Sequence, residues 1–304
     1  MTHREALIRV DEQMLDDAHS ARSSRGVFNS NLLYDQQGIL MRYMGLSEDL
    51  WLPAKLQSGW GTKTHGEFFD RDLIKSSKAP VLAWGNRFHD DLLKYDVESS
   101  MIGAPILYKD IDVSWIEPDR NSAIYFPIHS VDNITITNFQ SLGDIRKDIT
   151  ADRITMCLHI NDYKPEIIYM MKAFGFDCTT VGATHRQGFF WRCLALMAAH
   201  GYVATNVIST VAFYAALADR PCVVSGQTPT FTHEWPVVSR EWTQENFPEF
   251  LTLGNHVKAS MRELGVKYKR GPSKLRQLIL SAKDEWADEE RLYENLWTHQ
   301  KSLE

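Results

Sequence analysis

Short apolar runs that end in polar residues alternate with helix-compatible segments through the middle of the chain. Strands that alternate with helices of about 10 to 15 residues are typical of parallel βαβ units. The pattern therefore predicts an α/β fold with a parallel sheet in this region. The expected strands are 123–130, 153–162, 176–183, 202–206 and 221–226, and the expected helices are 138–149, 164–175, 187–201 and 207–219.

The first part of the chain is less regular. Residues 51–61, 79–87 and 100–110 each suggest a strand that runs into a Gly-rich or polar turn. Residues 116–122 (IEPDRNS) contain turn-forming residues without apolar periodicity, which is typical of a linker. We therefore expect a first α/β lobe that ends near residue 120.

Beyond residue 240 the pattern is mostly helical. The resulting expectation is an α/β protein with two Rossmann-like lobes and a C-terminal helical segment. The first lobe would span 1–120, the second 121–240, and the helices of 241–304 would pack across both lobes.

Composition narrows the function classes. The 304 residues carry a formal net charge of −6, so no global basic field would attract a nucleic-acid backbone. The four cysteines lie far apart without a C-x-x-C pair, which favours reduced thiols over disulfides or a zinc site. The charged N-terminus lacks an apolar signal core, and no run of about 20 apolar residues is uninterrupted. We expect a soluble, cytoplasmic protein.

Polar residues follow four of the expected strands. They are His129-Ser130, His159 to Asp162, Gly182 to His185, and Thr205 to Thr210. Ligands of open parallel sheets gather outside the carboxyl ends of the strands, so these segments are expected to line one edge.

The last of these segments has the features of a phosphate site. A helix that begins near Val207 would direct backbone N–H groups and its positive dipole end at the edge, and Ser209 and Thr210 would add hydroxyls. The alternative is that Asn206 is a helix N-cap and the hydroxyls bind local backbone.

Familiar nucleotide and hydrolase motifs are missing from the chain. It contains no G-x-x-x-x-G-K-[ST], no G-x-G-x-x-G after a strand, no H-E-x-x-H and no G-x-S-x-G. A P-loop nucleotidase, a standard dinucleotide site, a zincin and an α/β-hydrolase are therefore disfavoured.

The segment TNVISTVAFYAALADRPCVV (205–224) resembles the nucleotide-sugar site of GT-B glycosyltransferases, in particular bacterial enzymes of capsule and lipopolysaccharide biosynthesis. Residues 154–176 are similar to a companion block, and KLQSGWG, PVLAWGNR and MIGAPILYKD are similar to the acceptor lobe. The resemblance covers roughly residues 50 to 226. Its motifs are short and degenerate.

This resemblance implies a glycosyltransferase that moves a sugar from a nucleotide-activated donor to a bacterial glycan or lipid-linked acceptor. Catalysis would be metal-independent and cofactor-free, with the nucleotide-sugar as co-substrate and peripheral contact with the inner membrane face. Residues 1–120 would be the acceptor lobe and 121–240 the nucleotide-sugar lobe. The implied nucleotide-sugar residues are His129, Ser130, His159, Asn161, Asp162, Thr205, Asn206, Ser209 and Thr210.

Two departures from the family pattern restrict the mechanism. Many retaining GT-B enzymes carry E-x7-E around this helix, whereas Asn206 and Tyr214 occupy the matching positions here. Enzymes that use CMP-activated acidic sugars have a His-Pro pair and a Ser/Thr pair. This chain has Ser209-Thr210, but its histidine stands in His129-Ser130, so the match is half made.

Histidine and aspartate at the strand ends have a functional and a structural interpretation. His129 would donate to a nucleotide phosphate, which would favour its imidazolium form and lift its pKa to about 7–8. Otherwise it is a hydrogen-bonded histidine at a domain junction. Asp162 would accept from a ribose or base, or it caps the helix that begins near Lys164-Pro165.

The Gly-rich stretch GWGTKTHGEFFDRD (59–72) is the best place in the first lobe for a catalytic base. An inverting transferase needs a group that deprotonates the attacking hydroxyl, and His65, Glu67 and Asp70 are the candidates. The alternative is a solvated surface loop. Gly59, Trp60 and Trp84 would bind the acceptor, the tryptophans by stacking on a sugar face, unless they are half-buried packing residues.

Other functions stay open at this point. Asp110-Ile111-Asp112 matches the D-x-D with which GT-A enzymes hold a divalent metal, but this motif is common by chance among 39 acidic residues. The rival functions are a nucleotide-sugar epimerase or hydrolase of the same architecture, and a non-catalytic glycan-binding subunit.

Overall fold

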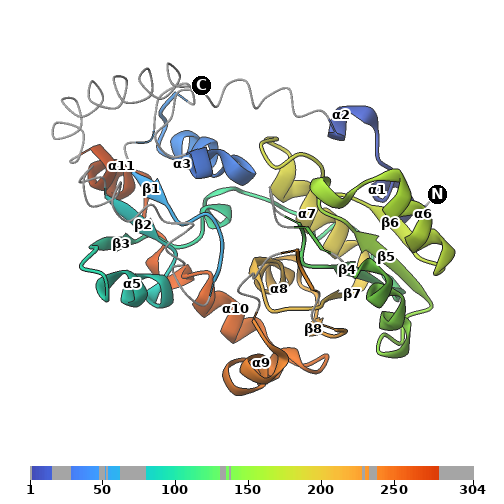
Figure 1. The fold of residues 1–304 in the computed structure, drawn as a ribbon. Coiled ribbons are helices and arrows are strands. Elements are labelled where there is room, and N and C mark those ends of the chain that lie inside the picture. Colours follow the sequence, from blue (N-terminus) through green and yellow to red (C-terminus); the bar gives the residue numbers. More distant parts are fainter. Residues whose placement is uncertain are drawn as a thin grey trace, which may run out of the picture. The chain divides into compact units, whose positions relative to one another are not determined.

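The computed structural model describes residues 2–15, 29–47, 52, 54–61, 80–130, 135–136, 138–227, 230–232 and 238–280. The chain forms two compact units (Figure 1). The large-sheet unit consists of Met1–Ala18 and Ile111–Met261, and the small-sheet unit of His19–Asp110 and Arg262–Glu304. Each unit is thus built from two separate stretches of sequence, unlike the three consecutive segments expected above.

The large-sheet unit contains a five-stranded sheet in which all neighbouring strands are parallel. Its strands are β4 (Asp119–Phe126), β5 (Arg153–Cys157), β6 (Asp177–Thr179), β7 (His200–Thr205) and β8 (Cys222–Val224). The spatial order is β6-β5-β4-β7-β8. The chain therefore builds outward from β4 in one direction and then in the other, as in doubly wound Rossmann-like sheets. The predicted parallel α/β fold is confirmed.

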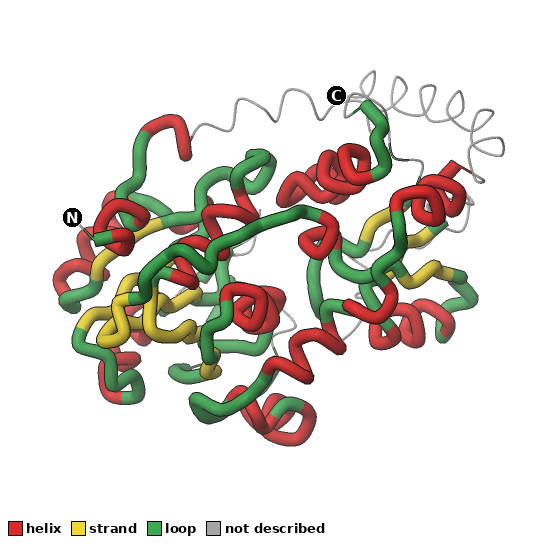
Figure 2. The backbone as a smooth tube through the Cα atoms, turned by 180° about the vertical axis from the view of Figure 1, so that it is seen from behind, coloured by secondary structure: helices red, strands yellow, loops and turns green. Residues whose placement is uncertain are grey.

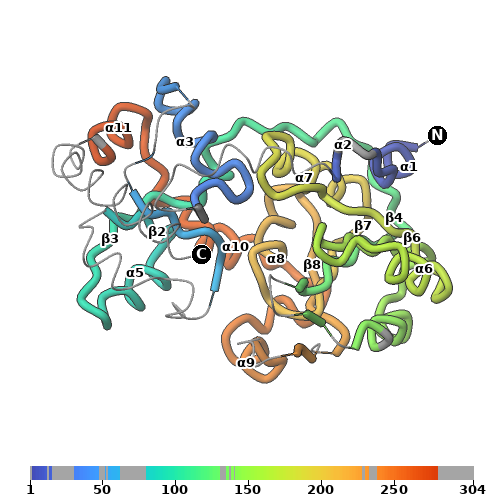
Figure 3. Tube along the Cα trace, turned by 45° about the horizontal axis from the view of Figure 1, so that its top comes forward, coloured from blue at the N-terminus to red at the C-terminus, as the bar shows by residue number. Residues whose placement is uncertain are grey.

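The topological switch point lies between β4 and β7, which can be followed side by side in Figure 3. Phe126 pairs with Thr205 at the ends of these strands, and Tyr125 pairs with Met156 of β5 on the other side. The carboxyl ends of β5, β4 and β7 are consequently neighbours.

Helical segments cover both faces of this sheet (Figure 2). The helical segments of this unit are α1 (His3–Leu7), α2 (Glu12–Leu15), η4 (Phe139–Lys147), η5 (Ile160–Asp162), α6 (Pro165–Ala173), α7 (Phe189–Ala198), α8 (Thr210–Tyr214), η6 (Ala215–Ala218), α9 (Arg240–Asn246) and η7 (Pro248–Phe250). α10 (Val257–Glu263) begins in this unit, and its last two residues belong to the small-sheet unit. Buried residues of η4 and α6 pack in one core with Tyr125, Met156 and Ala204 of the strands. α7 and α8 contact β7 and contribute no residue to that core, so they cover the other face. Burial on both faces explains the nearly continuous apolar strand sequences.

Two local predictions were wrong. The predicted linker 116–122 contains the start of β4, because Asp119 already pairs with His200 of β7. Gly201 lies inside β7 and does not close α7. A side chain there would place its Cβ 2.5 Å from the carbonyl oxygen of Arg120, so glycine permits the close approach of two strands.

The amino-terminal edge of the sheet is tied to α1 by a buried polar chain. Nη2 of Arg4 donates to Oγ1 of Thr155 over 2.9 Å, and Thr155 in turn bonds Nε2 of His200 at 2.9 Å. The other ring nitrogen of His200 donates to the carbonyl of Leu196 at 2.7 Å. Burial lowers the pKa of His200 to about 4, so the ring is neutral and accepts at Nε2. These hydrogen bonds explain why α1 belongs to the large-sheet unit.

The small-sheet unit contains three parallel strands in the order β1-β2-β3. They are β1 (Lys55–Leu56), β2 (Val81–Ala83) and β3 (Ser99–Met101). β1 and β2 lie within the predicted segments 51–61 and 79–87, and β3 begins one residue before the predicted segment 100–110. The helical segments are η2 (Asn29–Asp35), α3 (Gln36–Tyr43), α5 (Asn86–Leu93), η3 (Pro105–Tyr108), η8 (Val266–Tyr268) and α11 (Pro272–Leu280). Leu275 and Ile279 of α11 are fully buried, so the end of the described chain belongs to this core.

Residues 262–268 dock on the carboxyl ends of β2 and β3. The amide of Ala104 donates to the carbonyl of Leu264 over 2.8 Å. Gly265 has a φ of +68°, and a Cβ at this position would lie 1.8 Å from the carbonyl oxygen of Trp84. The contact is therefore one of backbone on backbone, which only glycine allows.

We predict that Gly265→Ala lowers the free energy of unfolding by ~3 kcal/mol or more, because it combines a positive φ with a severe overlap. Urea unfolding followed by circular dichroism measures the effect. Gly271→Ala is the matched control, since a Cβ at Gly271 meets nothing within 4 Å. Equal stability of the two variants would contradict this docking.

Candidate functional site

The carboxyl ends of β4, β5 and β7 bring together three of the four predicted polar segments. We call residues 127–130, 159–162 and 205–210 the switch-point edge. The amide of Ile128 donates to Oδ1 of Asn206 over 2.8 Å, which joins the end of β4 to the end of β7. The amide of Ser130 donates to Oδ2 of Asp162 over 2.8 Å, which joins it to the end of β5. The loop after β4 is thus held from both sides.

Neither Asn206 nor Asp162 is a helix N-cap, in contrast to the structural alternatives given above. The N-cap of α8 is Ser209, and that of α6 is Lys164. Asp162 is 3% exposed and Asn206 is 4% exposed, so the hydrogen bonds that their side chains accept from backbone amides are shielded from water. Both side chains position the loop rather than project from the edge.

Ser130 and Asn161 complete this framework. The Oγ of Ser130 accepts from the amide of Ile136 at 3.0 Å, and its carbonyl accepts from Nδ2 of Asn161 at 3.1 Å. Ser130 is buried, whereas Asn161 is exposed. Of this pair, only Asn161 has surface from which it could also reach a ligand.

His129 and His159 stack on each other at the edge. Their ring centroids lie 3.9 Å apart with an interplanar angle of 15°. Nδ1 of His129 bonds the carbonyl of Ser130 at 2.9 Å, and a carbonyl only accepts, so this nitrogen carries the proton. Nδ1 of His159 accepts from the amide of Asn161 at 3.2 Å, so its proton is on Nε2. The pair therefore offers one acceptor, Nε2 of His129, and one donor, Nε2 of His159.

Both rings are neutral. Burial lowers the pKa of His129, although its bond to Ser130 and the charge of Asp162 oppose the shift. Burial and the neighbouring ring of His129 lower the pKa of His159 to about 3. The pKa of His129 is therefore lowered and not raised as expected from the sequence, because desolvation disfavours the charged form of the ring.

The third side of the edge is the turn before α8. Thr205 is buried and its Oγ1 donates to the carbonyl of Val207 at 3.1 Å. Helical structure begins at Thr210, three residues later than predicted, and α8 continues directly into η6. The Ser209 side chain makes no capping bond to this helix. Ser209 and Thr210 are both partly exposed.

The end of β8 joins the same edge, although it was not among the predicted site segments. The hydroxyl of Tyr125 donates to the carbonyl of Ser225 at 2.8 Å, and Nδ2 of Asn206 lies 3.5 Å from the carbonyl of Gln227. The polar Ser225-Gly226 that ends the apolar run at 221–224 was the sequence signal for this segment.

The predicted segment Gly182 to His185 is not placed with the other three by any described contact. It follows β6, the outermost strand on that side of the sheet. The amide of Ala183 donates to the carbonyl of Met14 at 3.0 Å, so the N-terminal segment packs against this strand end.

The predicted acceptor residues lie in the small-sheet unit with different surroundings. Trp60 lines a cavity of about 440 Å³ and is partly exposed, and Gly59 precedes it in the turn after β1. Trp84 is 2% exposed, so it is a packing residue and not a stacking platform. The predicted catalytic residues His65, Glu67 and Asp70 lie outside the described residues.

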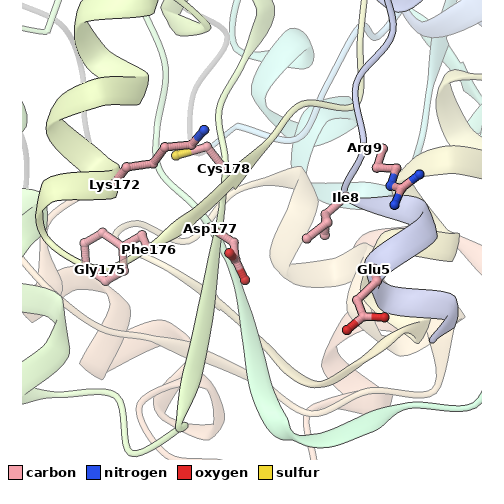
Figure 4. Close-up of a pocket in the computed structure, with 8 residues that line it drawn as sticks. All are labelled: Glu5, Ile8, Arg9, Lys172, Gly175, Phe176, Asp177 and Cys178. Carbon is pink, nitrogen blue, oxygen red and sulfur yellow. The ribbon is translucent and has the colours of Figure 1, made fainter. Parts of the chain in front are cut away.

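A second cavity, of about 720 Å³, lies beside the first residues of β6, away from the switch-point edge (Figure 4). Ile8 and Arg9 come from the N-terminal segment, and Lys172 and Cys178 come from α6 and β6. Burial raises the pKa of the Cys178 thiol to about 11, although the charge of Lys172 opposes the shift. The thiol is protonated at neutral pH, which does not favour nucleophilic chemistry here.

Of the two aspartates in the D-x-D motif, Asp112 has a local structural role. Oδ1 of Asp112 accepts from both the amide and the hydroxyl of Ser114, at 2.9 and 2.7 Å. Within the described ranges, no three His, Cys, Asp or Glu side chains gather as metal ligands.

No family model and no curated sequence matches the chain. Among the helices that the structure describes, none is both long and apolar enough to span a membrane.

We predict that the His159 ring titrates with a midpoint near pH 3 and that His129 titrates below its ordinary pKa of 6.5. Because both pKa values are lowered in the folded state, the neutral rings contribute stability above pH 6.5 that is lost as the pH falls. NMR of the ring resonances measures the midpoints. His159→Phe keeps a stacked ring and should flatten the acid limb of the stability profile. Titration of either ring near or above pH 6.5 would contradict the neutral pair.

Proposed function

We propose that the chain is a GT-B-like glycosyltransferase that binds a nucleotide-activated sugar at the switch-point edge. The observation that carries the proposal is the meeting of three fixed, polar strand ends at the switch point of a doubly wound sheet, where such sheets bind their ligands. The resemblance of residues 205–224 to nucleotide-sugar sites supports the same assignment.

The edge offers the donors that a nucleotide phosphate needs. Nε2–H of His159 is a neutral donor, and the Ser209 hydroxyl makes no capping bond. The loop after β4 is fixed by Asn206 and Asp162, so its backbone would not have to reorganise when a ligand binds. Donors held in place stabilise the negative charge that develops on a phosphate leaving group.

The acceptor would be a bacterial glycan or lipid-linked sugar, reached in the cytoplasm or at the inner membrane face. The catalytic base among His65, Glu67 and Asp70 stays a prediction from sequence. A non-catalytic glycan-binding subunit is the alternative from another class. It would bind sugar at the cavity that Trp60 lines and show no affinity for nucleotides.

We predict that Ser209→Ala combined with Thr210→Ala weakens nucleotide binding by about 1–3 kcal/mol, because hydrogen bonds to a charged group are lost. Thermal shift across CMP, UDP, GDP and dTDP identifies the nucleotide, and calorimetry with that nucleotide measures the affinity. The matched control is Ser239→Ala. Ser239 is the N-cap of α9, and its Oγ accepts from the Trp242 amide at 3.1 Å. Unchanged affinity in a folded double variant would overturn the proposed site, as would a panel without any binding nucleotide.

We also predict that Asp112→Asn and EDTA leave nucleotide affinity unchanged, because the Asp112 carboxylate is occupied by Ser114. The measurement is the same calorimetric titration with and without EDTA. Loss of binding on chelation that Mn²⁺ restores would instead favour a GT-A type of site at Asp110 and Asp112.

A further inference from the structure

A cavity of about 440 Å³ opens in the small-sheet unit at the carboxyl ends of its strands. Gln57, Trp60 and Gly61 follow β1, and Gly85 with the first residues of α5 follows β2. Residues of α10 and η8 complete the lining. The volume lies within the range of roughly 300–1,000 Å³ that is typical of small-molecule sites. The cavity thus lies outside the carboxyl ends of parallel strands, which is where open parallel sheets bind their ligands.

The carboxylate of Glu263 organises one wall of this cavity. It accepts from Nε1 of Trp60 at 2.8 Å, from Nε of Arg87 at 3.0 Å and from Nε of Arg262 at 2.9 Å. Although burial alone would raise it, these donors lower the pKa of Glu263 overall, so the side chain is a carboxylate at neutral pH. The three donors fill most of its acceptor positions, so it positions its neighbours rather than act as a base.

The turn that carries Trp60 is fixed as well. Nε2 of Gln36 donates to the carbonyl of Ser58 at 2.9 Å, and Nε2 of Gln57 donates to the carbonyl of Gly59 at 2.9 Å. Gln36 and Gln57 are both buried, at 0% and 3% exposure. The indole is thereby anchored at its backbone and at its N–H, and the guanidinium carbon of Arg87 lies over the ring, 5.7 Å from its centroid. Trp60 as a whole is partly exposed and lines the cavity.

The remaining lining combines donors and acceptors around a second aromatic ring. Nζ of Lys267 lies 4.6 Å from the ring centroid of Tyr268, whose hydroxyl bonds Oδ1 of Asn86. Asp90 adds a carboxylate to the lining. Sugar hydroxyls both donate and accept, and the C–H face of a sugar ring packs on an aromatic face. A lining with aromatic, cationic, amide and carboxylate groups therefore suits a sugar better than a purely apolar or purely anionic ligand.

We infer that this cavity binds one sugar unit, with Trp60 as the aromatic contact and Glu263 as the residue that positions it. The role of this sugar as the acceptor rests on the proposed transferase function. Its binding to the cavity does not, because it is a property of the small-sheet unit.

The test uses the full chain and a panel of methyl glycosides of glucose, galactose, N-acetylglucosamine and glucuronic acid. Saturation-transfer NMR detects binding, and titration gives the affinity. We expect millimolar binding of at least one glycoside, a loss of about tenfold or more in Trp60→Ala, and substantial retention in Trp60→Phe. Trp191→Phe is the control, because Trp191 is an exposed tryptophan of α7 in the large-sheet unit.

Glu263→Gln tests the positioning role. In the wild type the indole N–H resonance of Trp60 should have the shift of a charge-assisted hydrogen bond, and it should move toward that of a free indole in the variant as glycoside affinity falls. An unmoved resonance, or unchanged glycoside affinity with a moved resonance, would overturn the role of Glu263.

The nucleotide titration on the same variants separates the two proposals. Glycoside binding that depends on Trp60 without any nucleotide binding supports the cavity and overturns the transferase. Nucleotide binding with no bound glycoside, or with glycoside binding that Trp60→Ala leaves unchanged, overturns the cavity alone.

Discussion

Two side-chain-to-backbone hydrogen bonds fix the central loop of the large-sheet unit, and the proposed site depends on them. Asn206 binds the amide of Ile128 and Asp162 binds the amide of Ser130. The strands themselves satisfy their backbone groups in the sheet, but the first residues beyond a strand have no ladder partner. A buried amide without an acceptor costs roughly 1–3 kcal/mol, so these two side chains are required wherever the loop is shielded from water. They also hold His129 where it stacks on His159.

This constraint explains how far the site could be predicted from the sequence. Polar residues after apolar runs correctly indicated three of the strand ends that meet, those of β4, β5 and β7, because parallel strands place their carboxyl ends on one side. The pattern missed the end of β8 and included the end of β6, which no described contact joins to the others. The same pattern does not distinguish a side chain that binds a ligand from one that binds backbone. Asn206 and Asp162 were predicted to bind a nucleotide, yet their side chains accept hydrogen bonds from the amides of Ile128 and Ser130 in the loop after β4. To distinguish the two, the order of the strands must be known. That order places Ser130 next to Asp162, although 32 positions separate them in the sequence.

The fold shows the same limit at longer range. Periodicity predicted the strands and helices of the large sheet, but it could not assign residues 2–15 or 262–280 to a unit. Those assignments depend on Arg4 reaching Thr155 and on Gly265 passing within contact of Trp84, contacts that no local pattern encodes. Glu263 illustrates the point for the cavity. It is the last residue of α10, where a charged side chain is usually solvated. Only the three N–H groups that donate to it distinguish it from a solvated residue.

The neutral histidine pair also bears on how a phosphate would be held. A His159 pKa of about 3 means that protonation at pH 7 costs roughly 5 kcal/mol, since each pKa unit corresponds to about 1.4 kcal/mol. A phosphate that required an imidazolium would have to offset this cost from its own interaction energy. A neutral Nε2–H donor from His159 meets no such cost, and His129 then accepts from a hydroxyl or amide at its own Nε2. Nucleotide binding through this pair would depend little on pH near neutrality, in contrast to the weakening through pH 7–8 that a lone, charged His129 would produce.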